Sequence, residues 1–472
     1  MGDIEAMFCQ VRVPEDQRDC LRFLWWPNGD LDGKLEEYQM CVHYFGITSS
    51  PSCANYSLRR TATDNKSKYG GQAAQVLHRN FYVDDMLKSF ADEDSAISIV
   101  SNIRGMCQDG GFHLTKFHSN SRAVLESIPQ EERSKSLKDL DISIDPIPNE
   151  RALGMQWCPE RDVFTFTVNF KEKPLTRRGV LSTVSSMYDP LGLISPFLLE
   201  GKKLLQEICS NKCGWDEPLT DFQLQRFEKW KSQLKSLEEV EIHRCFKPKD
   251  FGVVINTSLH HFSDGAEEGY GQVSYVRYLN EKGQVHCQLA ISKSRVAPLK
   301  RPTIPRLELT SAVVSVKVSL FLNRELDTPI DEEYFWTDAQ VVLSYISNDS
   351  KRFHVYVANR TQFIREMTNL NQWNYVPSKE NPADPASKGL SLSSAAKVNL
   401  WFRGPDFLYE EKEHWPKQPN VLKLDNDDKE VRKIKVRSTK MKKLMSSSNT
   451  LIHGQRWYVW LFEFFAGESQ TE

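Results

Sequence analysis

The chain has 472 residues, of which 40% are hydrophobic and 26% are charged, and its mean hydropathy is −0.51. These values are typical of folded, water-soluble chains and exclude a largely disordered protein. The 61 basic and 63 acidic residues nearly cancel to a net charge of −2, so any nucleic-acid binding must come from local patches. At roughly 150 residues per domain, this length predicts about three domains.

Membrane insertion and secretion are not expected. The most apolar stretch, residues 457–466, contains a glutamate and is far shorter than the roughly 20 apolar residues of a membrane-spanning helix. Acidic Asp3 and Glu5 stand where a signal peptide would carry basic residues. The 10 cysteines show no zinc-binding spacing, so we expect free thiols in a reducing compartment. The sequence therefore predicts a non-secreted, cytoplasmic or nuclear protein that binds no membrane.

The first 125 residues mix helical and strand patterns. Residues 81–87 are apolar except for Asp84 and Asp85, which predicts a strand, a tight turn carrying both acids, and a returning strand. Adjacent carboxylates repel each other unless cations neutralise them, and hard oxygen ligands of this kind suit Mg²⁺. An exposed acidic turn is the simpler alternative.

The middle of the chain, residues 126–250, begins as a polar linker. We expect a hairpin within residues 153–169 and helices at both ends of residues 176–209, interrupted by the turn at Asp189-Pro190-Leu191-Gly192. An amphipathic helix is expected over residues 221–237.

A third unit, residues 251–395, shows the pattern of a three-strand meander followed by helices and short strands. The expected strands are 259–262, 271–279, 284–292, 334–337 and 373–376, and the expected helices are 304–323, 339–346 and 358–367. Periodicity is lost after residue 395, and residues 428–443 hold eight basic and two acidic residues. We expect residues 396–472 to be a linker and a flexible basic tail.

Four carboxylates of the third unit occupy distinctive places. Asp264 ends the first strand of the meander, Glu308 lies in the first turns of the following helix, and Asp338 follows the next strand. Asp384 lies in a late loop with the sequence Asn-Pro-Ala-Asp. If these four carboxylates converge, they would bind two Mg²⁺ ions about 4 Å apart, as in two-metal phosphodiester chemistry. Taken singly, Asp338 could be a helix N-cap, and Glu308 could merely complement a helix dipole.

Short motifs in the first 125 residues resemble the palm of reverse transcriptases. Asp3, followed five residues later by Phe8, resembles the first catalytic motif; residues 45–55 resemble the Gly and Ser-Pro motif, and residues 111–116 the later lysine motif. Phe45 departs from the family, because many reverse transcriptases have glutamine there. The resemblance implies Mg²⁺ ligands and substrate contacts: Asp3, Asp84 and Asp85 as catalytic metal ligands; Phe8, Phe45, Gly46, Ser50, Pro51, Tyr82, Lys116, Arg177 and Arg178 as substrate-binding residues.

These motifs, together with residues 175–178 and 189–193, resemble the Pol polyprotein of BEL/Pao-type LTR retrotransposons, from residue 3 to about residue 410. The third unit resembles the ribonuclease H fold. The resemblance implies a multidomain α+β and α/β protein: a partial palm (1–125), a thumb or connection (126–250), and a ribonuclease H-like domain (251–395). It implies an RNA-directed DNA polymerase and a ribonuclease H, with two Mg²⁺ per active site. The implied partners are an RNA–DNA hybrid, an RNA template with a DNA primer, and deoxynucleoside triphosphates.

Several readings stay open at this point. Reverse transcriptases carry a fingers subdomain before the palm, and here Asp3 is almost the first residue, so we expect weak or absent polymerase activity. Arg177 and Arg178 could instead belong to the solvated face of a helix. The alternative is a catalytically dead relic or a co-opted nucleic-acid-binding protein. An aspartic peptidase is a weaker alternative, since the nearest triplets, at Asp94 and Asp327, lack the required glycine.

Overall fold

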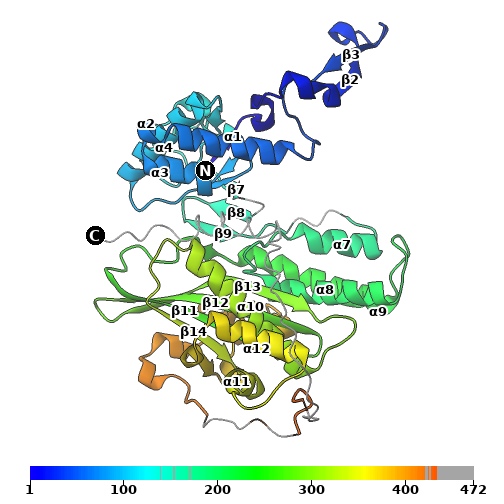
Figure 1. Cartoon of the computed structure of the whole chain (residues 1–472), viewed down its shortest axis with the longest axis vertical. Coiled ribbons are helices and arrows are strands. Elements are labelled where there is room, and N and C mark those ends of the chain that lie inside the picture. The colour runs from blue at the N-terminus through cyan, green and yellow to red at the C-terminus, as the bar shows by residue number, and fades with distance from the viewer. Residues whose placement is uncertain (139, 153–154, 169–171, 420–423, 425–426, 433–472) are drawn as a thin grey trace, which may run out of the picture. The chain divides into compact units, whose positions relative to one another are not determined.

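The computed structural model describes residues 1–138, 140–152, 155–168, 172–419, 424 and 427–432 (Figure 1). These residues form two compact units: unit 1 comprises 1–150 and 158–162, and unit 2 comprises the described residues within 151–157 and 163–432. The apolar stretch 457–466, most of the basic tail and the ends of the expected hairpin lie outside the described residues. In the described ranges, no helix combines the length and apolar character that crossing a bilayer requires.

Unit 1 is built around a small antiparallel sheet in the order β4-β5-β1-β6. Its strands are β1 (Gly2–Ile4), β4 (Phe81–Tyr82), β5 (Asp85–Met86) and β6 (Leu114–Thr115). The pairing of β4 with β5 confirms the predicted hairpin, but its turn residues are Val83 and Asp84, and Asp85 begins the returning strand. The helices of this unit are α1 (Ser50–Asp64), α2 (Lys66–Tyr69), α3 (Gly71–Arg79), α4 (Glu93–Asp109), α5 (Arg122–Glu126) and α6 (Lys135–Lys138).

The core of unit 1 joins the sheet to its helices. Ile4 of β1, Leu58 of α1 and Ile103 of α4 are all fully buried in one hydrophobic cluster. A separate exposed hairpin pairs β2 (Arg22–Trp25) with β3 (Glu36–Gln39). The burial of β1 therefore fixes the strand that carries Asp3.

A second four-stranded sheet has the order β10-β9-β8-β7. It consists of β7 (Glu150–Ala152), β8 (Met155–Cys158), β9 (Val163–Thr165) and β10 (Ile242–His243). The adjacent strands β8 and β9 confirm the expected hairpin in the part of it that is described.

Unit 2 is organised around a five-stranded sheet in the order β13-β12-β11-β14-β15. Strands β11 (Val254–Gly265), β12 (Gly269–Asn280) and β13 (Val285–Val296) form the predicted antiparallel meander. Strands β14 (Glu332–Thr337) and β15 (Trp373–Tyr375) run parallel to β11. The mixed α/β architecture agrees with the expected fold class.

The two faces of this sheet are covered by different segments. Phe335 of β14 packs in a cluster with α10 (Ile304–Glu325), α11 (Gln340–Ser347) and α12 (Val355–Met367). Neighbouring residues of a strand point to opposite faces. Trp336 accordingly contacts Phe407 and Trp415, with ring centroids 5.0 and 5.6 Å away.

Two further segments belong to unit 2. One lies in the expected connection, residues 126–250, and the other reaches into the expected linker, which begins at residue 396. Helix α8 (Ser195–Ser210) lies beside the edge strand β13, and α7 (Arg177–Ser186) and α9 (Asp221–Leu234) pack against α8 (Figure 1). The Ser195 hydroxyl is 2.7 and 2.9 Å from the hydroxyls of Ser292 and Ser294 on β13. Further along, α13 (Asp384–Lys388) and α14 (Ala395–Arg403) continue the fold, and Trp401 is fully buried.

Candidate active site

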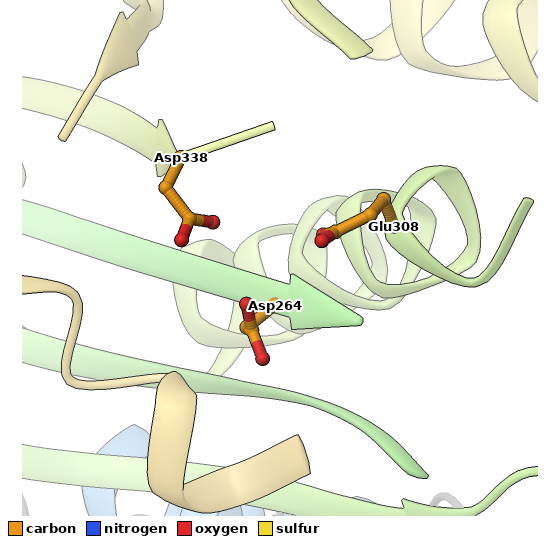
Figure 2. Close-up of side chains that lie close together, drawn as sticks. All are labelled: Asp264, Glu308 and Asp338. Atoms are coloured by element: carbon orange, nitrogen blue, oxygen red, sulfur yellow. The ribbon is translucent and has the colours of Figure 1, made fainter. Parts of the chain in front are cut away.

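Three carboxylates of unit 2 face one another near the C-terminal ends of strands β11 and β14 (Figure 2). Asp264, Glu308 and Asp338 each offer one oxygen, and these oxygens all lie within 4.8 Å of one another. Elsewhere in the described ranges, no three His, Cys, Asp or Glu side chains form such a group. The structure therefore brings together three of the four carboxylates that the sequence singled out in this unit.

The strand register explains how two of these acids meet. Strands β11 and β14 are parallel neighbours, with Ser263 opposite Thr337, so Asp264 and Asp338 leave the sheet at the same edge. Asp338 is not the N-cap of α11: that position is Ala339, which has no side-chain capping bond.

Glu308 reaches the same point because α10 begins very close to the end of β11. A Cβ on Gly265 would lie only 2.5 Å from the backbone nitrogen of Glu308, so only glycine permits this approach. Glu308 lies beyond the first turn of α10 and is 9% exposed, which is not the position of a residue that serves the helix dipole. Its side chain instead points toward Asp264 and Asp338 (Figure 2).

The cluster is electrostatically unfavourable without a cation. Burial, followed by the charges of Asp264 and Asp338, raises the pKa of Glu308 to about 9. Burial and the charge of Asp338 also raise the pKa of Asp264. Within the described part of the chain, Glu308 Oε2 is buried and has no hydrogen-bond partner. A divalent cation would satisfy that oxygen and offset the repulsion, and carboxylate oxygens are the ligands that Mg²⁺ prefers.

Neighbouring polar side chains hold Asp338 in place. The amide nitrogen of Asn381 donates to Asp338 Oδ1 over 3.2 Å and also lies 3.1 Å from the backbone oxygen of Ser263. The Ser378 hydroxyl donates to Asp338 Oδ2. Asn381 is the first residue of the Asn-Pro-Ala-Asp motif. The sequence analysis singled out this motif for Asp384 and missed the role of its asparagine.

Asp384 lies outside the group of three. It is the first residue of α13, and its carboxylate pairs with the ammonium groups of Lys388 and, over 3.3 Å, Lys397. Its charge still contributes to the raised pKa of Asp264, so it belongs to the surroundings of the cluster. Asp384 is therefore not among the three close carboxylates; it lies beside them and pairs with Lys388 of its own helix and with Lys397 of α14.

The polymerase-type acids of unit 1 lie on neighbouring strands. Asp3 of β1 is paired with Asp85 of β5, and the backbone nitrogen of Ile4 donates to the backbone oxygen of Asp84 over 2.9 Å. The Lys116 ammonium is 2.8 Å from Asp3 Oδ1. Burial, followed by the charges of Asp84 and Asp3, raises the pKa of Asp85 to about 6. In the described structure, however, these three carboxylates do not meet the spacing of the unit 2 cluster.

The expected substrate contacts of unit 1 differ in exposure. Phe8 lies in the hydrophobic core and packs edge-on against Phe45, which is 72% exposed. Gly46 has a positive φ of 95° just ahead of the motif that contains Ser50 and Pro51. The remaining members lie as follows: Ser50, buried, with its hydroxyl 2.9 Å from the backbone oxygen of Tyr44; Pro51, in the first turn of α1; Tyr82, half-buried on β4.

The two arginines of unit 2 expected to contact substrate have protein partners. The Arg177 guanidinium lies 4.1 Å from the ring centroid of Trp215 and donates to the backbone oxygen of Cys213. Arg178 forms an ion pair with Asp216 over 2.7 Å. Both arginines thus hold the start of α7 against the segment that follows α8.

Comparison with known proteins bears on unit 2. Residues 176–339 match the family described as the Pao retrotransposon-like RNaseH-like domain. The chain contains a Pao-type RNase H-like region. The match includes Asp264, Glu308 and Asp338 and begins just before α7, in the segment that the resemblance assigned to a thumb or connection. No curated protein matches the chain.

Two solved structures show similarity to part of the chain. One is RNase H1 from the archaeon Halobacterium salinarum, with 13% identity, a TM-score of 0.20, and coverage of 28% of this chain and 94% of the archaeal one. The other is the N-terminal RNase H domain of a Mycobacterium tuberculosis protein, solved as a fusion with maltose-binding protein. It has 10% identity, a TM-score of 0.20, and coverage of 31% of this chain and 95% of that chain.

Proposed function

We propose that unit 2 is a Mg²⁺-dependent ribonuclease that cleaves the RNA strand of an RNA–DNA hybrid. The proposal rests on one observation: three carboxylates, two buried and one half-buried, lie close together inside a Pao-type RNase H-like region, and Glu308 Oε2 has no hydrogen-bond partner among the described residues. The side chains that would hold Mg²⁺ are Asp264, Glu308 and Asp338, with Asp384 as a neighbouring fourth carboxylate.

The residues around the cluster support this chemistry. Held by Asp264, Glu308 and Asp338, Mg²⁺ would supply the activation of a water and the stabilisation of the leaving 3′ oxygen of a phosphodiester. Asn381 and Ser378 fix both oxygens of Asp338, so its carboxylate is oriented before any substrate binds. Burial of Glu308 and Asp264 keeps these two acids away from bulk water, which strengthens their attraction for a cation.

The test is cleavage of a hybrid whose RNA strand is labelled at one end. The full chain is expected to cut the RNA strand, to leave the DNA strand intact, and to lose activity when Mg²⁺ is chelated. Asp264→Asn should reduce cleavage to background. Asp349→Asn should not, because that carboxylate is exposed and pairs with Arg365. Tight hybrid binding without Mg²⁺-dependent cleavage would contradict the proposal and favour a relic or co-opted nucleic-acid-binding protein.

For unit 1 we infer the palm of an RNA-directed DNA polymerase. The pairing of Asp3 with Asp85 and the Lys116–Asp3 ion pair support the inference, with Asp3, Asp84 and Asp85 as the acids that would hold Mg²⁺. Primer extension on an RNA template with deoxynucleoside triphosphates tests it. Robust extension would overturn the expectation of weak activity.

A further inference from the structure

Helix α13 packs unusually closely against the sheet beside the carboxylate cluster. On β12, Gly271 is paired with Asp264, and a Cβ on Gly271 would lie 2.6 Å from the Cβ of Ala386 in α13. A glycine at this place therefore permits the backbone of α13 to approach the end of β11. This approach brings the residue after Ala386 within reach of Asp264.

That residue, Ser387, is fully buried and bonds directly to the cluster. Its hydroxyl donates to Asp264 Oδ2 and lies 3.0 Å from the backbone oxygen of Asp384. A hydroxyl has one proton to donate, and a carboxylate is a stronger acceptor than a neutral carbonyl. The Ser387 hydroxyl therefore donates its hydrogen bond to Asp264 and not to the backbone oxygen of Asp384.

Because the bond is made to Oδ2, Oδ1 of Asp264 keeps all of its acceptor capacity for a metal ion. Figure 2 shows the two oxygens of Asp264 on opposite sides of the carboxylate, one of them facing the space shared with Glu308 and Asp338. A carboxylate held at one oxygen cannot rotate freely about its last torsion. The hydrogen bond therefore limits the direction in which the free oxygen is presented.

We propose that Ser387 is a positioning residue for Asp264, fixing its carboxylate so that one oxygen is offered to the metal shared with Glu308 and Asp338. The inference rests on the proposed metal-dependent function of this site. Side chains that hydrogen-bond to metal ligands typically change metal affinity by about 10- to 100-fold when they are removed. A purely structural Ser387 would affect folding and leave metal affinity unchanged.

The experiment measures Mn²⁺ binding to the full chain by electron paramagnetic resonance, without nucleic acid, for wild type, Ser387→Ala and Ser387→Thr. Ser387→Ala is expected to weaken Mn²⁺ binding about tenfold. It should raise the Mg²⁺ concentration for half-maximal hybrid cleavage by the same factor, with activity recovering at high Mg²⁺. Ser387→Thr keeps the hydroxyl donor and should bind Mn²⁺ more tightly than Ser387→Ala.

The matched control is Ser344→Ala. Ser344 is also a buried serine of unit 2, but its hydroxyl donates to the backbone oxygen of Gln340, so Mn²⁺ binding should not change. The melting temperature in chelator reports the folding of each variant.

Three results would overturn the inference. One is wild-type Mn²⁺ affinity in Ser387→Ala. Another is an equal loss of affinity in Ser344→Ala. The third is a loss in Ser387→Ala that tracks its metal-free melting temperature and is not restored by Ser387→Thr. In each case a wild-type chain that binds Mn²⁺ and cleaves hybrid would leave the proposed function standing. A wild-type chain that does neither would overturn both.

Discussion

Replacing Gly265 by alanine is a sharp test of how the cluster is assembled. The added Cβ would lie 2.5 Å from the backbone nitrogen of Glu308 and 2.7 Å from the backbone carbonyl carbon of Leu307. Both atoms belong to the backbone of α10, so no side-chain rotation relieves the contact. Either the end of β11 or the start of α10 must move, and Glu308 then shifts away from Asp264.

The magnitude follows from the cost of overpacking. Adding a methyl group to a close-packed site typically costs about 1–3 kcal/mol. For a domain of roughly 150–250 residues, each kcal/mol lowers Tm by about 2–4 °C. We therefore expect Gly265→Ala to lower the melting temperature by roughly 2–12 °C.

The assay combines thermal unfolding in chelator with hybrid cleavage and Mn²⁺ binding. Cleavage and metal affinity should fall further than the loss of stability explains, because the substitution separates the ligands. Gly214→Ala is the control, since its nearest neighbour would be a side-chain atom of Glu217 at 3.6 Å. A Gly265→Ala protein that melts, binds Mn²⁺ and cleaves like wild type would refute this account of the geometry.

Three further predictions concern stability. Burial raises the pKa of Glu308 from 4.5 to about 9, so the folded metal-free protein binds more protons than the unfolded one between these values, and its stability should fall as pH rises from 4.5 to 9. Glu308→Gln should flatten that slope and raise Tm in chelator at pH 8; an unchanged slope would contradict the assignment. Glu333 accepts from the buried His261 over 3.0 Å, and its pKa is lowered to about 2, so its contribution is present above pH 4.5 and is lost as pH falls toward 2. Glu333→Gln should cost about 1–3 kcal/mol by urea unfolding at pH 7 and less at pH 3; an equal cost at both pH values would argue against a stabilising role of the Glu333 charge. Trp401→Ala should lower the free energy of unfolding by about 3–5 kcal/mol, because the indole is fully buried and donates to the backbone oxygen of Leu193. An unchanged free energy of unfolding would contradict a structural role of α14 in unit 2.

The parts of the fold that could be predicted from sequence are those determined by residues close together in the chain. The hairpin of β4 and β5, the meander and the helix after it could be predicted because they depend on alternation and turn residues close together in the chain. The places of Asp264 and Asp338 also followed, because strand ends that pair in parallel meet at one edge.

The rest depended on contacts between distant segments. Nothing local to Asp384 shows that Lys397 reaches its carboxylate, and serines are too common for Ser387 to stand out by itself. The segment around Trp401 lacks periodicity, yet it is held by single buried aromatic residues that pack against unit 2. Helix α8 likewise packs on unit 2 through contacts between the hydroxyl of Ser195 and two serine hydroxyls of β13. These contacts could not be predicted from the sequence pattern.

The most direct test of the metal site is crystallographic location of Mn²⁺ by anomalous scattering in the full chain. We predict Mn²⁺ peaks within bonding distance of Asp264, Glu308 and Asp338, and loss of those peaks in Asp264→Asn. Crystals soaked in Mn²⁺ that show no anomalous density at these carboxylates would contradict the account.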